Sequence, residues 1–159
     1  DAGDWDAALQ TAETAVANSS DPDLILFAAA VAEQAGSDAR AAELRDQAKE
    51  LLADNPLGYW VSLGNRRLRV FNADAAQEAA KEALALAPDD AEVALLLGRI
   101  AIERGDRQVA LAELDRAYNL SVDTSPQVAV TARVMYAELM RQIEMPEMGA
   151  TTEMTTTTP

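Results

Sequence analysis

The chain has 159 residues and a net charge of −14 at pH 7, and 49% of its residues are hydrophobic. A chain this acidic is a poor partner for nucleic acid or anionic membranes, and no apolar stretch approaches the roughly 20 residues of a membrane span. It has no Cys and no His, which excludes thiol chemistry, disulfides, Cys/His metal sites and His-based catalysis. The composition fits a soluble protein, either cytoplasmic or exported to the periplasm.

The 34 alanines favour helix, because alanine has the highest helix propensity, and no run alternates long enough to predict a strand. A cap residue followed by proline marks helix starts at Asp21-Pro22, Asn55-Pro56 and Ser125-Pro126. In chain order we expect helices over 4–18, 22–35, 38–53, 56–70, 73–87, 90–104, 107–120 and 126–142. Their short connections require successive helices to be antiparallel neighbours.

An internal repeat of about 34 residues runs through these helices. Leu63-Gly64 recurs as Leu97-Gly98, 34 residues later. Two series of alanines share the same steps of 33, 35 and 34 residues: Ala8, Ala41, Ala76, Ala110 and Ala15, Ala48, Ala83, Ala117. Two series with the same irregularities rarely arise by chance, so the pattern predicts a stack of equivalent helix pairs.

The repeat resembles the tetratricopeptide repeat, whose pattern is W-x2-L-G, two alanines and a closing proline. The segment 57–90 matches with Trp60, Leu63, Gly64, Ala76, Ala83 and Pro88. The segments 91–124 and 22–56 match less fully, and the resemblance covers residues 3 to about 142. It implies an all-α, right-handed superhelical α-solenoid of antiparallel pairs with about eight helices.

Within this fold, small residues should let the two helices of a pair approach closely. Gly64, Gly98 and Ala29 are expected to thin the first helix where the second helix crosses it. The domain would span 1–142, with the helices 4–18 and 126–142 lacking a pair mate, and a Thr/Met/Pro-rich tail would follow over 143–159. The composition of the tail is typical of a disordered segment or linker.

No catalytic constellation emerges from the sequence. The carboxylates of Asp21, Asp23, Asp89 and Asp90 stand at helix starts, where they satisfy free N–H groups. No glycine-rich phosphate loop or dense run of calcium ligands occurs. We therefore expect no enzyme, no cofactor and no metal.

The resemblance implies that the first helix of each pair lines a concave groove. Asn65, Arg99 and Arg133 are spaced 34 apart and should face the same side of successive repeats. Candidate peptide-binding residues are Asn65, Leu68, Arg69, Arg99, Ile102, Arg133 and Tyr136, and Leu26, Ala30 and Glu33 are the groove positions expected on the helix 22–35. Arginine grips carboxylates in a fork, so an acidic peptide or a C-terminal carboxylate is the expected ligand. The alternative is that these arginines pair with Glu92 and Glu103 within the scaffold.

The expected function is a protein–protein interaction scaffold that binds a peptide or partner protein. A second possibility is a structural subunit of a larger assembly, such as a bacterial envelope component or filament, built by head-to-tail packing of the terminal helices. A third is a non-catalytic segment of a multidomain protein. The unpaired helices 4–18 and 126–142 favour self-association or a longer array, because each would leave one face uncovered.

Overall fold

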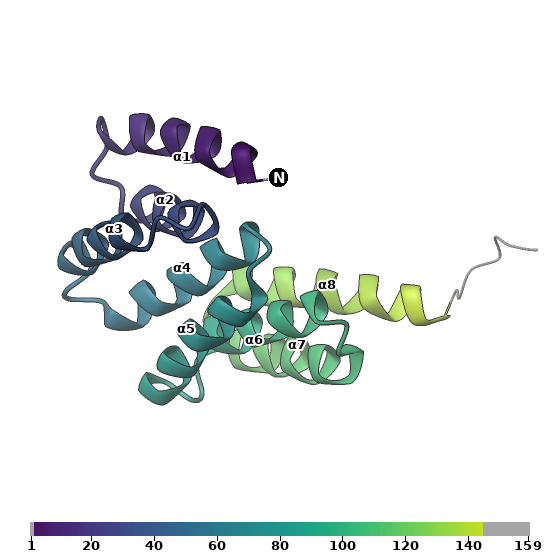
Figure 1. The fold of residues 1–159 in the computed structure, drawn as a ribbon. Coiled ribbons are helices and arrows are strands. Elements are labelled where there is room, and N and C mark those ends of the chain that lie inside the picture. Colours follow the sequence, from purple (N-terminus) through teal and green to yellow (C-terminus); the bar gives the residue numbers. More distant parts are fainter. Residues whose placement is uncertain (1, 145–159) are drawn as a thin grey trace, which may run out of the picture.

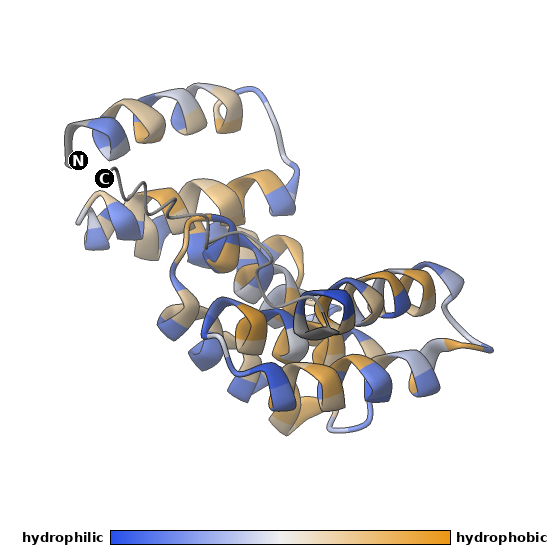
Figure 2. Ribbon diagram, turned by 90° about the vertical axis from the view of Figure 1, so that its right-hand side faces the viewer, coloured by the Kyte–Doolittle hydropathy of each residue, from blue (hydrophilic) through white to orange (hydrophobic). Residues whose placement is uncertain are grey.

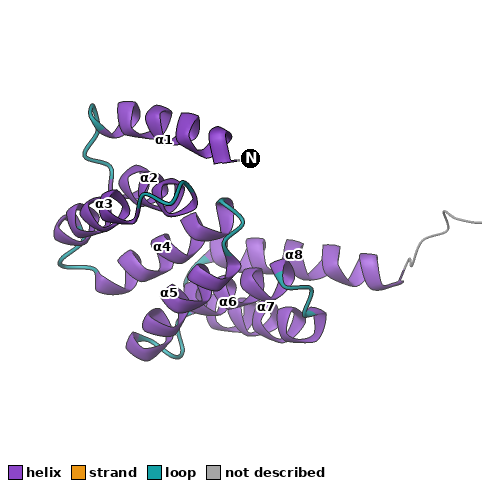
Figure 3. Ribbon diagram, viewed as in Figure 1, coloured by secondary structure: helices purple, strands orange, loops and turns teal. Residues whose placement is uncertain are grey.

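The computed structural model describes residues 2–144, which form eight helices and no strand (Figures 1 and 3). The helices are α1 (Ala2–Val16), α2 (Pro22–Gln34), α3 (Asp38–Leu51), α4 (Pro56–Arg69), α5 (Ala73–Leu86), α6 (Ala91–Glu103), α7 (Arg107–Ser121) and α8 (Pro126–Glu144). The predicted all-α class is confirmed. The largest differences from the predicted bounds are two residues: α1 begins and ends two residues earlier, α3 ends two residues earlier, and α8 runs two residues further, into the predicted tail. From residue 145 onward that tail lies outside the described residues.

Cap residues explain where the helices begin and end. The side chains of Asp21, Asn55, Asn72, Asp90 and Asp106 each accept a hydrogen bond from a backbone N–H in the first turn that follows. Left-handed residues follow the ends of α2, α4 and α6: Gly36 (φ 72°), Phe71 (φ 59°) and Gly105 (φ 73°). Phe71 thus stands where its two counterparts are glycine, and its side chain is 81% exposed.

The Asp90 cap gives a direct stability test. Its Oδ1 accepts hydrogen bonds from the backbone N–H groups of Glu92 (2.8 Å) and Val93 (3.1 Å). Asp90→Ala is expected to lower the free energy of unfolding by about 1 kcal/mol, measured by urea denaturation. The neighbouring Asp89→Ala is the control, because this carboxylate is 88% exposed and caps nothing. Equal losses in the two variants would contradict the assigned cap.

The helices pack in sequential antiparallel pairs that form two layers. The pairs are α2 with α3, α4 with α5, and α6 with α7, and the helices α2, α4, α6 and α8 also contact one another in succession. Among the described residues, the backbones of α1, α3, α5 and α7 do not approach each other in this way, although Nε of Arg40 on α3 donates to Oε1 of Glu13 on α1 (2.7 Å). The layer of α2, α4, α6 and α8 is therefore closely packed, and the helices of the other layer lie further apart. The array curves as a result, with α1 and α8 at opposite ends (Figure 1). Hydrophobic and hydrophilic residues are interleaved along the helices (Figure 2).

The small residues pack closely, although not all against the expected helix. A Cβ on Gly98 would lie 3.0 Å from Cδ2 of Leu114, on the pair mate α7 as predicted. A Cβ on Gly64 would lie 2.7 Å from Cδ2 of Leu96, on the first helix of the next pair. The lack of a side chain at Gly64 therefore allows close packing between its helix pair and the next one. It does not serve the packing of the two helices within its own pair. Trp60 packs against two core clusters and joins neighbouring pairs.

A network of ion pairs and hydrogen bonds around the side chain of Glu33 joins the four helices α2, α3, α4 and α5. The Glu33 carboxylate accepts hydrogen bonds from Nε (2.9 Å) and Nη2 (2.7 Å) of Arg67 and also pairs with Arg45. Nη1 of Arg67 donates to the carbonyl of Ala75 on α5 (2.9 Å). The expectation that Glu33 lines the groove is therefore wrong: its side chain is 12% exposed and held between α3 and α4.

Candidate functional site

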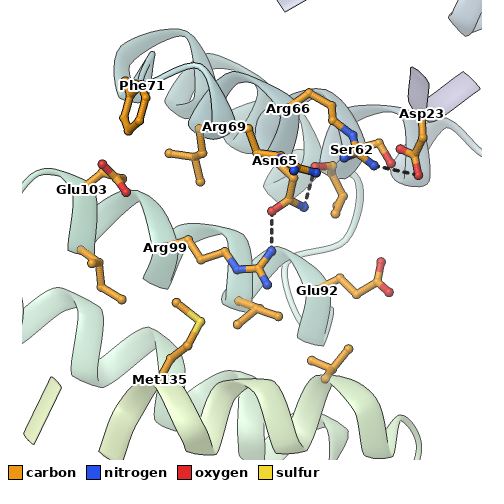
Figure 4. Close-up of a pocket in the computed structure, with 15 residues that line it drawn as sticks. Asp23, Ser62, Asn65, Arg66, Arg69, Phe71, Glu92, Arg99, Glu103 and Met135 are labelled. Carbon is orange, nitrogen blue, oxygen red and sulfur yellow. Dashed lines mark hydrogen bonds and ion pairs between the residues drawn. The ribbon is translucent and has the colours of Figure 1, made fainter. Parts of the chain in front are cut away.

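A groove of about 730 Å³ crosses α4 and α6 and reaches α2 and α8. Five of the predicted peptide-binding residues line it together: Asn65, Leu68, Arg69, Arg99 and Ile102. They stand on the facing sides of two first helices, because a period of 34 residues brings equivalent positions of α4 and α6 to the same side. Figure 4 shows Asn65, Arg69 and Arg99 in this arrangement.

The other two predicted residues, Arg133 and Tyr136, do not line this groove. On α8 the lining residues are Val128 and Met135, and Met135 stands one position before the expected Tyr136. One residue along a helix corresponds to a rotation of about 100°. The helix is turned because it buries the row Val128, Ala132, Met135 and Leu139. Arg133 instead lies over the ring of Tyr118, 5.5 Å from its centroid, and over the ring of Tyr136, at 5.7 Å.

Arg99 is the cation at the centre of the groove. Its Nη1 donates to Oδ1 of Asn65 (2.7 Å), and Nδ2 of Asn65 donates to the carbonyl of Val61 (3.0 Å) (Figure 4). The Asn65 amide is thereby fixed with its oxygen toward the guanidinium. Arg99 is half-buried, and the loss of hydration lowers the pKa of its guanidinium below the ordinary value. Among residues 4–142, no carboxylate forms an ion pair with Arg99.

The carboxylates expected to neutralise this arginine lie at the rim. Glu92 and Glu103 line the groove but are exposed, and neither pairs with Arg99 in the described part of the chain (Figure 4). The pairing of Arg99 with Glu92 or Glu103, which the sequence left open, is thus absent there. Arg99 therefore lines the groove with a hydrogen bond to Asn65 and without a carboxylate partner among the described residues.

Two further arginines extend the site toward α2. Nη2 of Arg66 pairs with Oδ2 of Asp23 at 3.0 Å, while its Nε is buried and has no hydrogen-bond partner among the described residues. The guanidinium of Arg69 lies 5.9 Å from the ring centroid of Phe27. These side chains also line an adjoining hollow of about 270 Å³ between α2 and α4. The groove on α4 and α6, where the repeat period predicted binding residues, is therefore continued by a hollow beside α2.

Sequence reasoning missed Asp23, Phe71 and Met135 as lining residues. Asp23 looks like an ordinary residue of a first helical turn, and Phe71 lies in the turn after α4. Only the glycines at the equivalent positions, Gly36 and Gly105, could have signalled that the Phe71 side chain is presented by a left-handed turn.

Equal numbers of cationic and anionic side chains line the groove. Three arginines and three carboxylates line it, in a chain with a net charge of −14. Leu68, Leu95, Ile102 and Met135 add apolar surface. Over the described residues, no three acidic, His or Cys side chains are placed to hold a metal ion. None of the described helices is long and apolar enough to cross a membrane.

Comparison with known proteins adds no family assignment, since the chain matches no protein-family model and no curated protein.

Proposed function

We propose that this chain is a non-enzymatic, tetratricopeptide-like interaction scaffold whose groove binds an extended acidic segment of a partner protein. The observation that carries the proposal is the half-buried Arg99 guanidinium, which has a neutral amide and no carboxylate beside it among the described residues. A cation that has lost hydration and lacks a counterion gains most from an incoming anion.

The surroundings of Arg99 support an extended peptide as the ligand. Asn65 fixes one side of the guanidinium and leaves other N–H groups for a ligand oxygen. Leu68 and Ile102 line the same groove and offer apolar contact. The groove runs across α4 and α6 and reaches α2 and α8, so an extended segment of a few residues can lie along it.

Peptide selection followed by affinity measurement tests the proposal. We expect a random peptide library displayed against the immobilised chain to yield sequences enriched in Asp, Glu or a free C-terminal carboxylate. Fluorescein-labelled copies, followed by anisotropy, should bind Arg99→Gln about 10- to 100-fold more weakly. A hydrogen bond to a charged group contributes roughly 1.5–3 kcal/mol, and each 1.4 kcal/mol is about tenfold in affinity.

Arg107→Gln is the matched control, because it removes the same charge from an exposed residue of α7 that does not line the groove. Its affinity for the selected peptides should equal that of the unaltered chain. Peptides that bind Arg99→Gln undiminished, or whose Gln- and Asn-substituted copies bind equally well, would contradict the proposal.

A further inference from the structure

Phe71 is an aromatic residue that the turn after α4 holds in solvent while it lines the groove. Its side chain is 81% exposed. The ring belongs to none of the hydrophobic clusters formed by the described residues. Single exposed hydrophobic residues are common on protein surfaces, so the backbone of Phe71 and its surroundings have to show what the ring does.

The backbone of Phe71 is strained. Its φ of 59° lies in the left-handed region, where the Cβ of an L-residue crowds the following carbonyl oxygen. At the equivalent turns after α2 and α6 the chain has Gly36 and Gly105, which have no Cβ. Because the Phe71 ring is mostly exposed, it gives little packing in return for this strain. A strained residue whose side chain does not serve the fold points to a function for that side chain.

The surroundings of Phe71 make this end of the groove apolar. Leu68 and Ile102 occupy equivalent positions in the last turns of α4 and α6, and both line the groove while partly packed on the core. Figure 4 shows Phe71 and Glu103 on the same side of Arg99. The carboxylate of Glu103 is exposed and would repel a second acidic group of a ligand there. This end therefore favours an apolar group, and the acidic group belongs at Arg99.

The length of α4 between these two places sets the spacing of the two ligand groups. Asn65 contacts the Arg99 guanidinium, and Arg69, the last residue of α4, follows four residues later. At roughly 1.5 Å per residue, the end of α4 lies about 6 Å beyond Asn65, and Phe71 is in the turn that follows. An extended chain advances roughly 3.3 Å per residue. A ligand with its carboxylate at Arg99 therefore reaches Phe71 with a side chain two or three residues away.

We propose that Phe71 determines ligand specificity by binding a large apolar side chain that lies two or three residues from the acidic residue at Arg99. The inference rests on the proposed function and narrows its ligand from any acidic segment to one with this pair of residues. The left-handed turn presents the ring to the ligand and lowers stability in doing so. Phe71→Gly should therefore raise stability and lower affinity, whereas a structural role of the ring predicts that both fall.

Peptide affinity and stability of Phe71→Gly together test the inference. Library peptides selected on the unaltered chain should carry a large aliphatic or aromatic residue two or three positions from the acidic residue or terminal carboxylate. Fluorescein-labelled copies should bind Phe71→Gly about 10-fold more weakly, because an apolar contact is lost. The urea midpoint of this variant should rise. Leu86→Ala is the matched control, since it removes an exposed apolar side chain of α5 that does not line the groove, and it should bind like the unaltered chain.

A double-mutant cycle assigns the contact to the ring. Peptide copies in which Ala replaces the apolar residue should bind the unaltered chain about 10-fold more weakly. The same replacement should change nothing further for Phe71→Gly, because the two groups that it separates are already apart. Arg99→Gln should weaken both peptide copies by the same factor, which separates the acidic contact from the apolar one.

The possible failures are distinguishable. Acidic peptides that lose affinity for Arg99→Gln but bind Phe71→Gly undiminished would overturn this inference alone. Selected peptides without any acidic residue would overturn the proposed function and the inference with it. A lower urea midpoint for Phe71→Gly would assign the ring to the fold, and selection of Lys or Arg at the apolar position would assign this end of the groove to a cation. Self-association of the unaltered chain that Phe71→Gly abolishes, measured by light scattering, would assign the ring to a contact between copies; each of these three results also refutes the inference.

Discussion

Arg67→Ala is expected to lower the free energy of unfolding by about 3 kcal/mol, because it leaves a buried carboxylate with one partner in place of two. The side chains of Arg67 and Glu33 are 11% and 12% exposed, and two hydrogen bonds join them. The variant also removes the donor to the Ala75 carbonyl. Urea denaturation followed by circular dichroism at 222 nm measures the loss.

Two further variants separate the buried pair from ordinary surface charge. Arg104→Ala breaks the ion pair between Arg104, whose side chain is 41% exposed, and Asp74, whose side chain is 95% exposed. This variant should lower the free energy of unfolding by less than about 0.5 kcal/mol. The double variant Glu33→Leu with Arg67→Met should recover a large part of the stability lost in Arg67→Ala, since it removes the unsatisfied carboxylate. Equal losses for Arg67→Ala and Arg104→Ala would show that the network contributes little.

Gly64→Val is expected to destabilise the chain by about 3 kcal/mol, through overpacking between two helix pairs. A Cβ at this position would already lie 2.7 Å from Cδ2 and 3.2 Å from Cδ1 of Leu96. Leu96 is 0% exposed and packs with Ala76, Ala80 and Ile100, so it has little room to move. Urea denaturation measures the change.

The control for this variant is Ala85→Val, which places the same side chain at an exposed position of α5. It should cost no more than the roughly 0.6 kcal/mol of helix propensity. Adding Leu96→Ala to Gly64→Val tests the assigned contact, because it makes room for the new side chain. If the double variant is no more stable than expected from the sum of the two single changes, the clash with Leu96 is not the cause.

Local signals in the sequence were sufficient for the helices and their pairing. Cap residues such as Asp21, Asn55 and Asp90 act within one turn of their own helix, so each can be recognised without knowledge of the fold. The two alanine series placed small residues on the second helices, where Ala76, Ala83, Ala110 and Ala117 are indeed buried. The same periodicity brought Asn65 and Arg99 together on α4 and α6, 2.7 Å apart.

The tertiary structure decided the rotation of α8 about its axis and the position of the Glu33 side chain, neither of which follows from the repeat length alone. The rotation of α8 about its axis depends on which of its apolar rows buries more surface against α6 and α7, and the row with Val128 and Met135 is buried there. That choice turned Arg133 away from the groove and onto Tyr118. Likewise Glu33 occupies a groove position by counting, but two arginines on neighbouring helices hold it inside.

The sequence by itself therefore determined the all-helical array, the starts of the capped helices and the groove-facing sides of α4 and α6, because these follow from caps and periodicity within single helices and adjacent pairs. The tertiary structure decided that Arg99 lacks a carboxylate partner in the described chain and that the Phe71 ring faces solvent. Both depend on the three-dimensional neighbours of a side chain, and those neighbours come from several helices at once.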